Sequence, residues 1–229
     1  MFDLHGYGPS ILEGTLLTIE VSLASLAISM FLGILGALAK LSPSRPLQLA
    51  AQTYTTIIRG IPDLVLMLLV FFGGQVFINQ MAPLVGFEDY IDINPFFAGV
   101  STIGFIFGAY MTETFRGAIL AVPRGQIEAA YAYGMHRSQT FFRILLPQMI
   151  RHAIPGFGNN WLVLVKTTAL VSIIGLDDMV RKAALAAGAT RMPFTFYIVV
   201  AINYLIITSI SVTALKWLED RYSLGVIKA

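Results

Sequence analysis

Five long apolar segments constrain the fold of this chain more than any other feature of its sequence. They run approximately over residues 11–39, 54–78, 95–111, 154–176 and 194–215. Each has roughly the 20 residues that a helix needs to cross the hydrocarbon core of a bilayer. Apolar residues make up 56% of the chain and charged residues only 12%, which lies far outside the range of soluble domains. We therefore expect an all-α, polytopic membrane protein with about five transmembrane helices, folded as one domain over residues 1–229.

The loop charges predict how the chain is oriented in the membrane. Lys and Arg recur in the 40–52 loop, in the 117–152 loop and in the tail after the last segment. The opposite side carries acidic residues, among them Asp3 and Glu88. Because cytoplasmic loops are enriched in Lys and Arg, we expect a periplasmic N-terminus and a cytoplasmic C-terminus. The 177–191 loop holds three cations on the periplasmic side and runs against this rule.

An amphipathic stretch lies between the third and fourth apolar segments, at about residues 124–151. It contains Glu-Ala-Ala-Tyr-Ala-Tyr-Gly, then nine residues, then Ile-Leu-Leu-Pro. We expect a short helix, a turn at Gly134, and a second helix that is capped by Ser138 and stopped by Pro147. Glycine suits such a turn because it adopts a left-handed backbone conformation without a Cβ clash. Taken alone, the stretch would also suit an amphipathic helix lying on the membrane surface.

The spacing of this stretch resembles the EAA loop in the membrane subunits of bacterial ABC importers, where the loop docks onto the ATP-hydrolysing subunit. The resemblance implies the type I permease fold in the bacterial inner membrane. It also implies as partners two ATP-binding subunits, a second permease subunit (identical or paralogous) and a periplasmic binding protein. ATP and Mg would be bound by the ATP-binding partner, since this chain has no phosphate-binding Gly-x-x-x-x-Gly-Lys motif. The residues that carry the resemblance, and would contact the ATPase, are Glu128, Ala129, Ala130, Gly134, Ile144, Leu146 and Pro147.

Charged residues near or within the apolar segments are informative, because each costs about 2.5–3.5 kcal/mol at a helix centre. Arg59 and Asp63 are four apart, and Glu113 and Arg116 three apart, so each pair can share a helix face. Lys166 has no opposite charge nearby in sequence and needs a partner from another helix. We expect these residues to line a water-filled substrate path. The alternative is that Arg59, Glu113 and Arg116 snorkel from the cytoplasmic helix ends; we favour the path for the two carboxylates and snorkelling for Arg116, and leave Lys166 open.

Small residues and one proline predict two further features of the helices. Proline removes a backbone donor and weakens the helix before it, so Gly60-Ile61-Pro62 predicts a break in the second segment, flanked by Arg59 and Asp63. Glycines on the first segment, at 33 and 36, and on the third, at 104 and 108, predict that helices approach closely there.

The motifs Arg59-Gly-Ile-Pro, Gly108-Ala-Tyr-x-x-Glu113-x-x-Arg116-Gly-Ala and Lys166-Thr-Thr-Ala-Leu resemble the polar amino acid branch of these permeases. The chain is most similar to the permease subunits of histidine and lysine–arginine–ornithine importers, with octopine and nopaline permeases as close competitors. Many members of the branch carry leucine where this chain has Asp63. Together with Glu113, that extra carboxylate favours a cationic solute by charge complementarity.

Other classes of function fit the sequence less well. A membrane enzyme could use Glu113, Asp63 or His152 as acid and base, but no cofactor motif supports it. A membrane scaffold would explain the amphipathic stretch without explaining charges inside apolar segments. The absence of cysteine and the scatter of the three histidines predict no metal site. A formal charge of +2 without a basic run predicts no nucleic-acid partner.

Overall fold

The computed structural model of the chain describes residues 4–87 and 89–222. Asp3, Glu88 and the last residues of the tail lie outside this part, so the charge argument that used them stays a prediction. The described residues form helices joined by loops and contain no strand. In order these are α1 (Gly8–Leu41), α2 (Arg45–Gly60), α3 (Asp63–Leu68), η1 (Leu69–Gly73), α4 (Gly74–Met81), η2 (Ala82–Val85), α5 (Pro95–Leu120), α6 (Arg124–Ala132), α7 (Arg137–Thr140), η3 (Phe141–Leu145), α8 (Leu146–Thr167), η4 (Thr168–Ser172), α9 (Met179–Thr190) and α10 (Pro193–Tyr222).

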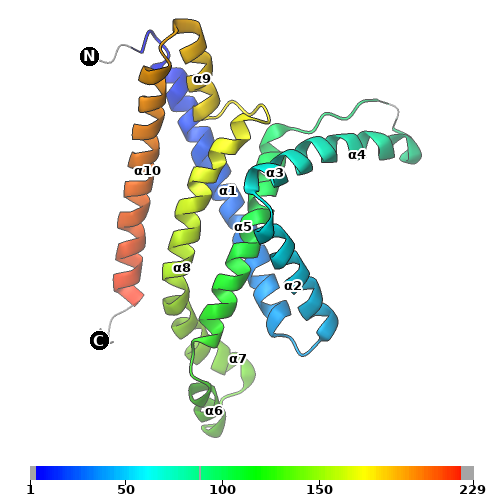
Figure 1. The fold of residues 1–229 in the computed structure, drawn as a ribbon. Coiled ribbons are helices and arrows are strands. Elements are labelled where there is room, and N and C mark those ends of the chain that lie inside the picture. The colour runs from blue at the N-terminus through cyan, green and yellow to red at the C-terminus, as the bar shows by residue number, and fades with distance from the viewer. Residues whose placement is uncertain (1–3, 88, 223–229) are drawn as a thin grey trace.

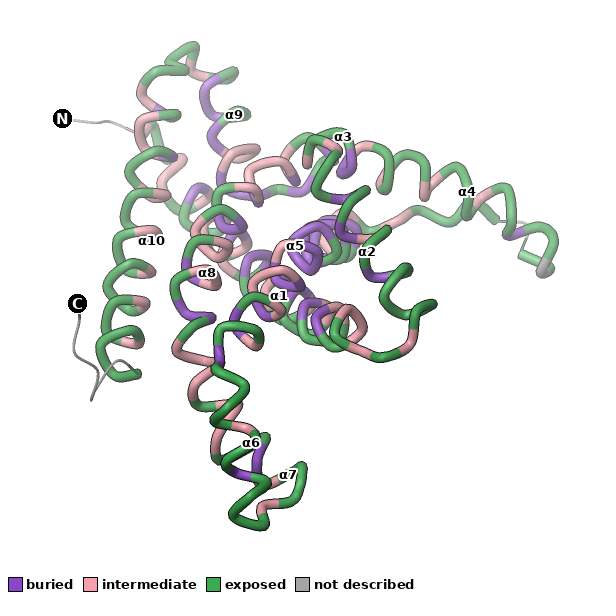
Figure 2. The backbone as a smooth tube through the Cα atoms, turned by 60° about the horizontal axis from the view of Figure 1, so that its bottom comes forward, coloured by how far each residue is buried: buried purple, intermediate pink, exposed green. Residues whose placement is uncertain are grey.

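The core of the molecule is the contact between α1 and α5, two long helices that lie against each other (Figures 1 and 2). Glycines make this contact close, as the sequence predicted. A Cβ atom at Gly33 of α1 would lie 2.4 Å from Met111 Cβ, and one at Gly108 of α5 would lie 2.8 Å from Leu32 Cβ. Because neither distance leaves room for a methyl group, the two helices pack nearly backbone to backbone. The inward faces of α1 and α5 are accordingly the most buried part of the chain.

Within the described residues, four helical stretches are long and apolar enough to cross a membrane, namely Gly8–Leu41, Asp63–Leu84, Pro95–Leu120 and Pro193–Tyr222. The fifth expected span, 154–176, is placed differently. Its helix α8 begins at Leu146 and ends at Thr167, where a 3-10 turn follows. It lies beside α5 and α10 (Figure 1), so its polar residues sit in a bundle of long helices.

The second expected span, 54–78, is wrong as one continuous helix. The predicted break at Gly60-Ile61-Pro62 is present, but it separates α2 from α3 completely, because Ile61 and Pro62 are both extended (ψ 138° and 135°). The helix before the break also starts earlier than expected, at Arg45, inside the stretch that was predicted to be a loop. Pro46 does not prevent this, since the first turn of a helix needs no N–H donor at that position.

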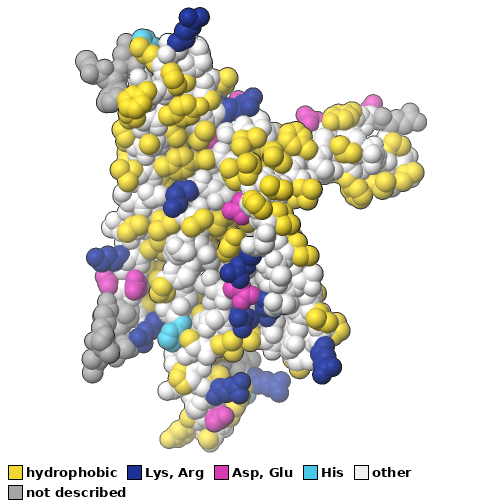
Figure 3. Space-filling model, viewed as in Figure 1, with side chains coloured by type: hydrophobic (Ala, Val, Ile, Leu, Met, Phe, Trp, Pro, Cys, Tyr) yellow, Lys and Arg dark blue, Asp and Glu magenta, His cyan; other side chains and the backbone are white. Residues whose placement is uncertain are grey.

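The helices after the break form an arm that extends away from the bundle (Figures 1 and 2). Polar side chains of α4 hold the returning chain: Ile91 N donates to Asn79 Oδ1 at 2.8 Å, and Ile93 N donates to Gln75 Oε1 at 2.9 Å. Figure 3 shows hydrophobic side chains over much of the upper part of this face and over the arm, whereas most of the Lys and Arg lie in its lower half. The arm and α10 are largely uncovered within this chain, which suits contact with lipid or with a partner subunit.

Candidate functional site

The amphipathic stretch predicted from the sequence forms a separate lobe at one end of the bundle (Figures 1 and 2). Helix α6 is followed by a turn in which Gly134 has φ +76°, as expected for a glycine chosen for its left-handed conformation. Gly134 N donates to Tyr131 O at 2.9 Å, and Met135 N donates to Ala130 O at 3.0 Å. These two bonds satisfy carbonyls at the end of α6 and set the direction in which the chain leaves the turn.

The second helix of the lobe differs from the prediction at both ends. Its cap is His136, whose ring accepts from Gln139 N while the Gln139 side chain accepts from His136 N, so Ser138 is not the cap. Pro147 does not stop the helix either. The π-helical turn η3 leads directly into α8, with Pro147 in the first turn of α8. A proline, which has no backbone N–H, is tolerated there because the wider π turn before it does not need a hydrogen bond from that position.

The motif residues of the lobe divide into an exposed and a packed set. Glu128, Ala129, Gly134 and Pro147 are exposed, Ile144 and Leu146 are half-buried, and Ala130 is buried. The exposed surface of the lobe is also aromatic: Tyr133 is 89% and Phe142 64% exposed. An apolar, aromatic surface that this chain leaves uncovered is typical of a protein interface.

A second group of functional candidates lies on the face of α5 that is turned toward α2. Glu113 accepts from Arg116 Nε at 3.0 Å, which confirms the predicted pair on one helix. Its other oxygen forms an ion pair with Lys40, at the end of α1. Lys40 Nζ also donates to Gln52 Oε1 at 2.8 Å and to Thr55 Oγ1 at 2.6 Å, both on α2. The Lys40–Glu113 cluster therefore joins α1, α2 and α5 through one buried ammonium group.

Arg59 and Asp63 are placed on either side of the helix break, so they do not share a helix face as predicted. Both interact electrostatically with Tyr110 of α5. The Arg59 guanidinium lies over the Tyr110 ring, 5.3 Å from its centroid, in cation–π geometry. The break therefore holds a cation, a carboxylate and a phenol close together, one helical turn from Glu113 on α5.

Lys166 lies in the last turn of α8 and is exposed. The sequence predicted a partner for it on another helix. None of the acidic residues described in this chain forms an ion pair with Lys166. Its ammonium group is thus available to a carboxylate from outside the chain.

Sequence reasoning missed two residues of this region, Lys40 and Tyr110. Lys40 was counted only among the cations of the 40–52 loop, and Tyr110 only as part of a motif. The signal that could have found Lys40 is the polar face of α2, formed at helical spacing by residues 45, 48, 52, 55 and 59. That periodicity was not recognised because residues 45–52 were predicted to belong to a loop, and only the later part of α2 to a helix.

The motifs and the fold can be compared with known proteins. The family model described as "Binding-protein-dependent transport system inner membrane component" matches residues 29–224. The histidine/lysine/arginine/ornithine transport system permease protein HisQ of Salmonella typhimurium is 50% identical over 226 residues, covering 99% of both chains. The octopine transport system permease protein OccQ of Agrobacterium tumefaciens is 42% identical over 225 residues, covering 98% of this chain and 95% of OccQ.

Solved structures agree with these relatives. A chain in the crystal structure of an amino acid ABC transporter with histidines matches with a TM-score of 0.79 and 32% identity, covering 94% of this chain and 95% of that one. A chain of the inward-facing MetNI methionine ABC transporter, at 17% identity and a TM-score of 0.67, shares the fold. This chain therefore belongs to the family of binding-protein-dependent transport system inner membrane components, and is a multi-pass inner-membrane permease with the type I ABC importer fold.

Proposed function

We propose that this chain is a permease subunit of an ATP-driven importer of polar, cationic amino acids of the histidine, arginine, lysine and ornithine type. It would take solute from a periplasmic binding protein and release it into the cytoplasm. Its 50% identity to HisQ over almost the whole length carries the proposal. In the membrane it would be a single domain with a periplasmic N-terminus and the α6–α7 lobe in the cytoplasm.

The α6–α7 lobe would transmit force from two ATP-binding partner subunits, which hold ATP and Mg. Three observations support this role: the lobe projects from the bundle, its motif residues Glu128 and Ala129 are exposed, and its aromatic side chains lack cover in this chain. The continuous helix through η3 into α8 would carry a displacement of the lobe into the bundle as a rigid-body motion.

The substrate path would follow the charged face of α5 between a second permease subunit and α2. Asp63 and Glu113 would favour a cationic solute, while Arg59 and Lys166 would offer partners for its α-carboxylate; Arg116, which pairs with Glu113, would stand at the edge of this path. Glu113 is already paired with Lys40 and Arg116, so Asp63 is the carboxylate with more capacity for solute. It has no ion pair with any described residue.

Uptake by the complex in liposomes, with its ATPase and binding protein, tests the substrate assignment. We would compare arginine, histidine and glutamine for the native chain and for Asp63→Leu. A selective loss of the cationic solutes, with glutamine retained, is expected if Asp63 reads charge within the membrane. An equal change for all three solutes would place selectivity in the binding protein and make Asp63 structural.

The coupling role is tested separately with Gly134→Asp. This change puts a charged side chain on the turn of the lobe at a positive φ, so we expect ATP hydrolysis to be uncoupled from transport while membrane insertion continues. Gly86→Asp is a matched control, since Gly86 is also exposed with φ +89° and has nothing within 4 Å of its Cβ position. Normal uptake by Gly134→Asp at a normal protein level would refute the coupling role.

Two alternatives lead to different results in the same assays. Octopine, nopaline or glutamine as solute would leave the coupling experiment unchanged and shift only the uptake profile. A membrane scaffold would bind the partner subunits through the lobe, but would show no solute-dependent stimulation of the partner ATPase.

A further inference from the structure

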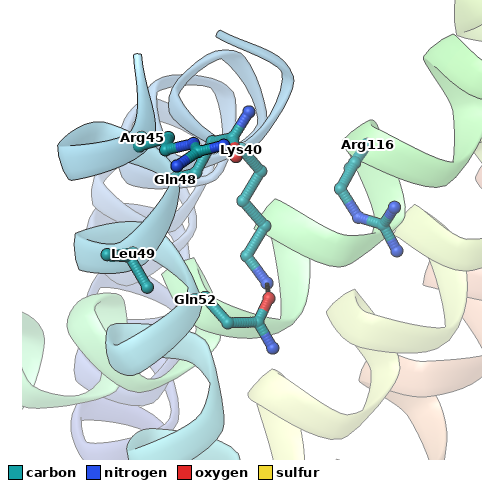
Figure 4. A pocket seen from close by; sticks show the side chains of 6 residues that line it. All are labelled: Lys40, Arg45, Gln48, Leu49, Gln52 and Arg116. Atoms are coloured by element: carbon teal, nitrogen blue, oxygen red, sulfur yellow. Dashed lines mark hydrogen bonds between the residues drawn. The ribbon is translucent and has the colours of Figure 1, made fainter. Parts of the chain in front are cut away.

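A cationic hollow of about 490 Å³ opens between the end of α1, the first turns of α2 and the last turns of α5. Figure 4 shows Lys40 and Gln52 meeting on one side of it and Arg116 across from them. Arg45 and Gln48 lie together near the start of α2 (Figure 4). The side chains that line it are Lys40, Arg45, Gln48, Leu49, Gln52 and Arg116.

The charges of the hollow are not balanced within the chain. Three cations line it, and Glu113 is the one carboxylate among the described residues that pairs with any of them. Lys40 uses its donors on Gln52, Thr55 and Glu113. Arg116 uses only Nε on Glu113, which leaves its two terminal amino groups without an acidic partner among the residues that the structure describes. The exposed guanidinium of Arg45 forms no ion pair with a described residue either.

The hollow lies near the ends of α1 and α5 and the start of α2, where lipid headgroups would stand in a membrane crossed by α1 and α5. Arg116 precedes the end of α5 at Leu120 by about 6 Å along the helix axis, and Arg45 is the first residue of α2. The headgroup layer on each side of the hydrocarbon core is about 5–8 Å thick. Exposed leucines of α2 stand near these cations: Leu49 lines the hollow itself, and Leu47 directly precedes the lining residue Gln48. The pattern is a cationic interior beside an apolar edge.

We propose that this hollow binds the phosphate group of an anionic phospholipid, such as phosphatidylglycerol. The planar guanidinium of arginine donates two parallel hydrogen bonds to the oxygens of a phosphate group. Basic pockets between membrane helices bind the headgroups of anionic lipids. The free amino groups of Arg116 and the Arg45 guanidinium would hold the phosphate, with the acyl chains along the exposed leucines. Such a lipid would bridge α2 and α5, the two helices that flank the charged face.

The test measures thermal unfolding of the purified chain in micelles as phosphatidylglycerol is added, with phosphatidylethanolamine as the neutral-headgroup control. Phosphatidylglycerol should raise the midpoint of the native chain, and Arg45→Gln should weaken that response by about tenfold in lipid concentration, as expected for loss of one charged hydrogen-bonding group. Arg45→Glu should abolish it. The matched control is Arg191→Gln, which removes an exposed cation just before α10 and should respond like the native chain.

Two results would overturn the proposal. An unchanged response in Arg45→Glu would show that the lipid acts elsewhere on the chain. If inorganic phosphate alone produced the Arg45-dependent shift, and phosphatidylglycerol added nothing to it, the hollow would be a site for soluble anions. Thermal unfolding in micelles does not depend on transport, so a failure of the lipid proposal is distinct from a failure of the proposed import function.

Discussion

Replacing Gly33 by alanine tests whether the α1–α5 contact organises the molecule. A methyl group at this position would lie 2.4 Å from Met111 Cβ and 3.1 Å from the Met111 carbonyl carbon. Carbon atoms pack at about 3.5–4 Å, so the two helices would have to separate by roughly 1 Å. Neither Met111 atom is the end of a flexible side chain, so a rotamer change cannot relieve the clash.

Overpacking of this kind costs about 1–3 kcal/mol. The gain from replacing glycine inside a helix, about 0.5–1 kcal/mol, offsets part of it. We therefore expect Gly33→Ala to lose about 1–2 kcal/mol of stability. At roughly 2–4 °C per kcal/mol for a chain of this size, the unfolding midpoint should fall by about 2–8 °C.

The assay is thermal unfolding in detergent micelles, with Gly117→Ala as the matched control. Gly117 is inside α5, and nothing lies within 4 Å of its Cβ position. The same substitution there should be neutral or stabilising by up to about 1 kcal/mol. If Gly33→Ala proved as stable as Gly117→Ala, the α1–α5 contact would not be as close as the structure shows.

Two further predictions concern buried charges. Burial raises the pKa of Asp178, the cap of α9, from 3.8 to about 6, against the lowering effect of backbone N–H groups. Because the folded state then binds the proton more tightly, the free energy of unfolding should be greatest below about pH 4 and fall by about 3 kcal/mol as the pH rises to 6 and above. Unfolding midpoints taken from pH 4 to 7 should show this fall for the native chain, and Asp178→Asn should flatten it. A native chain without such a fall would contradict the prediction. Lys40→Met removes the buried partner of Glu113 and should cost about 1–3 kcal/mol, measured by thermal unfolding. Lys182→Met, which breaks an exposed contact with Asp177 at 3.9 Å, should cost less than about 1 kcal/mol, and equal losses would refute the difference.

Local sequence signals anticipated much of the fold. The length of the apolar segments predicted long membrane helices, because a helix must satisfy its own backbone groups in lipid. Gly134 predicted the turn of the lobe, since few other residues adopt φ +76° without strain. The helix break after Gly60 followed from Pro62 alone. Each of these features depends on residues that are neighbours in the chain.

Glycine spacing predicted that helices approach closely, but helix boundaries and ion pairs that depend on a neighbouring helix could not be predicted from the sequence. Pro147 is a strong stop signal by itself, yet it lies in the first turn of α8, which continues directly from η3 and packs against α5 and α10. The boundary of α2 was wrong for a similar reason. Its polar face is stabilised by Lys40 and Glu113 from other helices, which a reading of one segment cannot include.

The amino-acid sequence by itself determined that this chain is a helical membrane protein with an exposed EAA-type segment, because hydrophobic length and backbone conformation are local properties. Only the tertiary structure decided which charges meet. It paired Glu113 with Lys40, separated Arg59 from Asp63 across a break beside Tyr110, and left Lys166 without an acidic partner among the described residues. Ion pairing falls off within a few ångströms, and the packing of α1, α2 and α5 sets those distances.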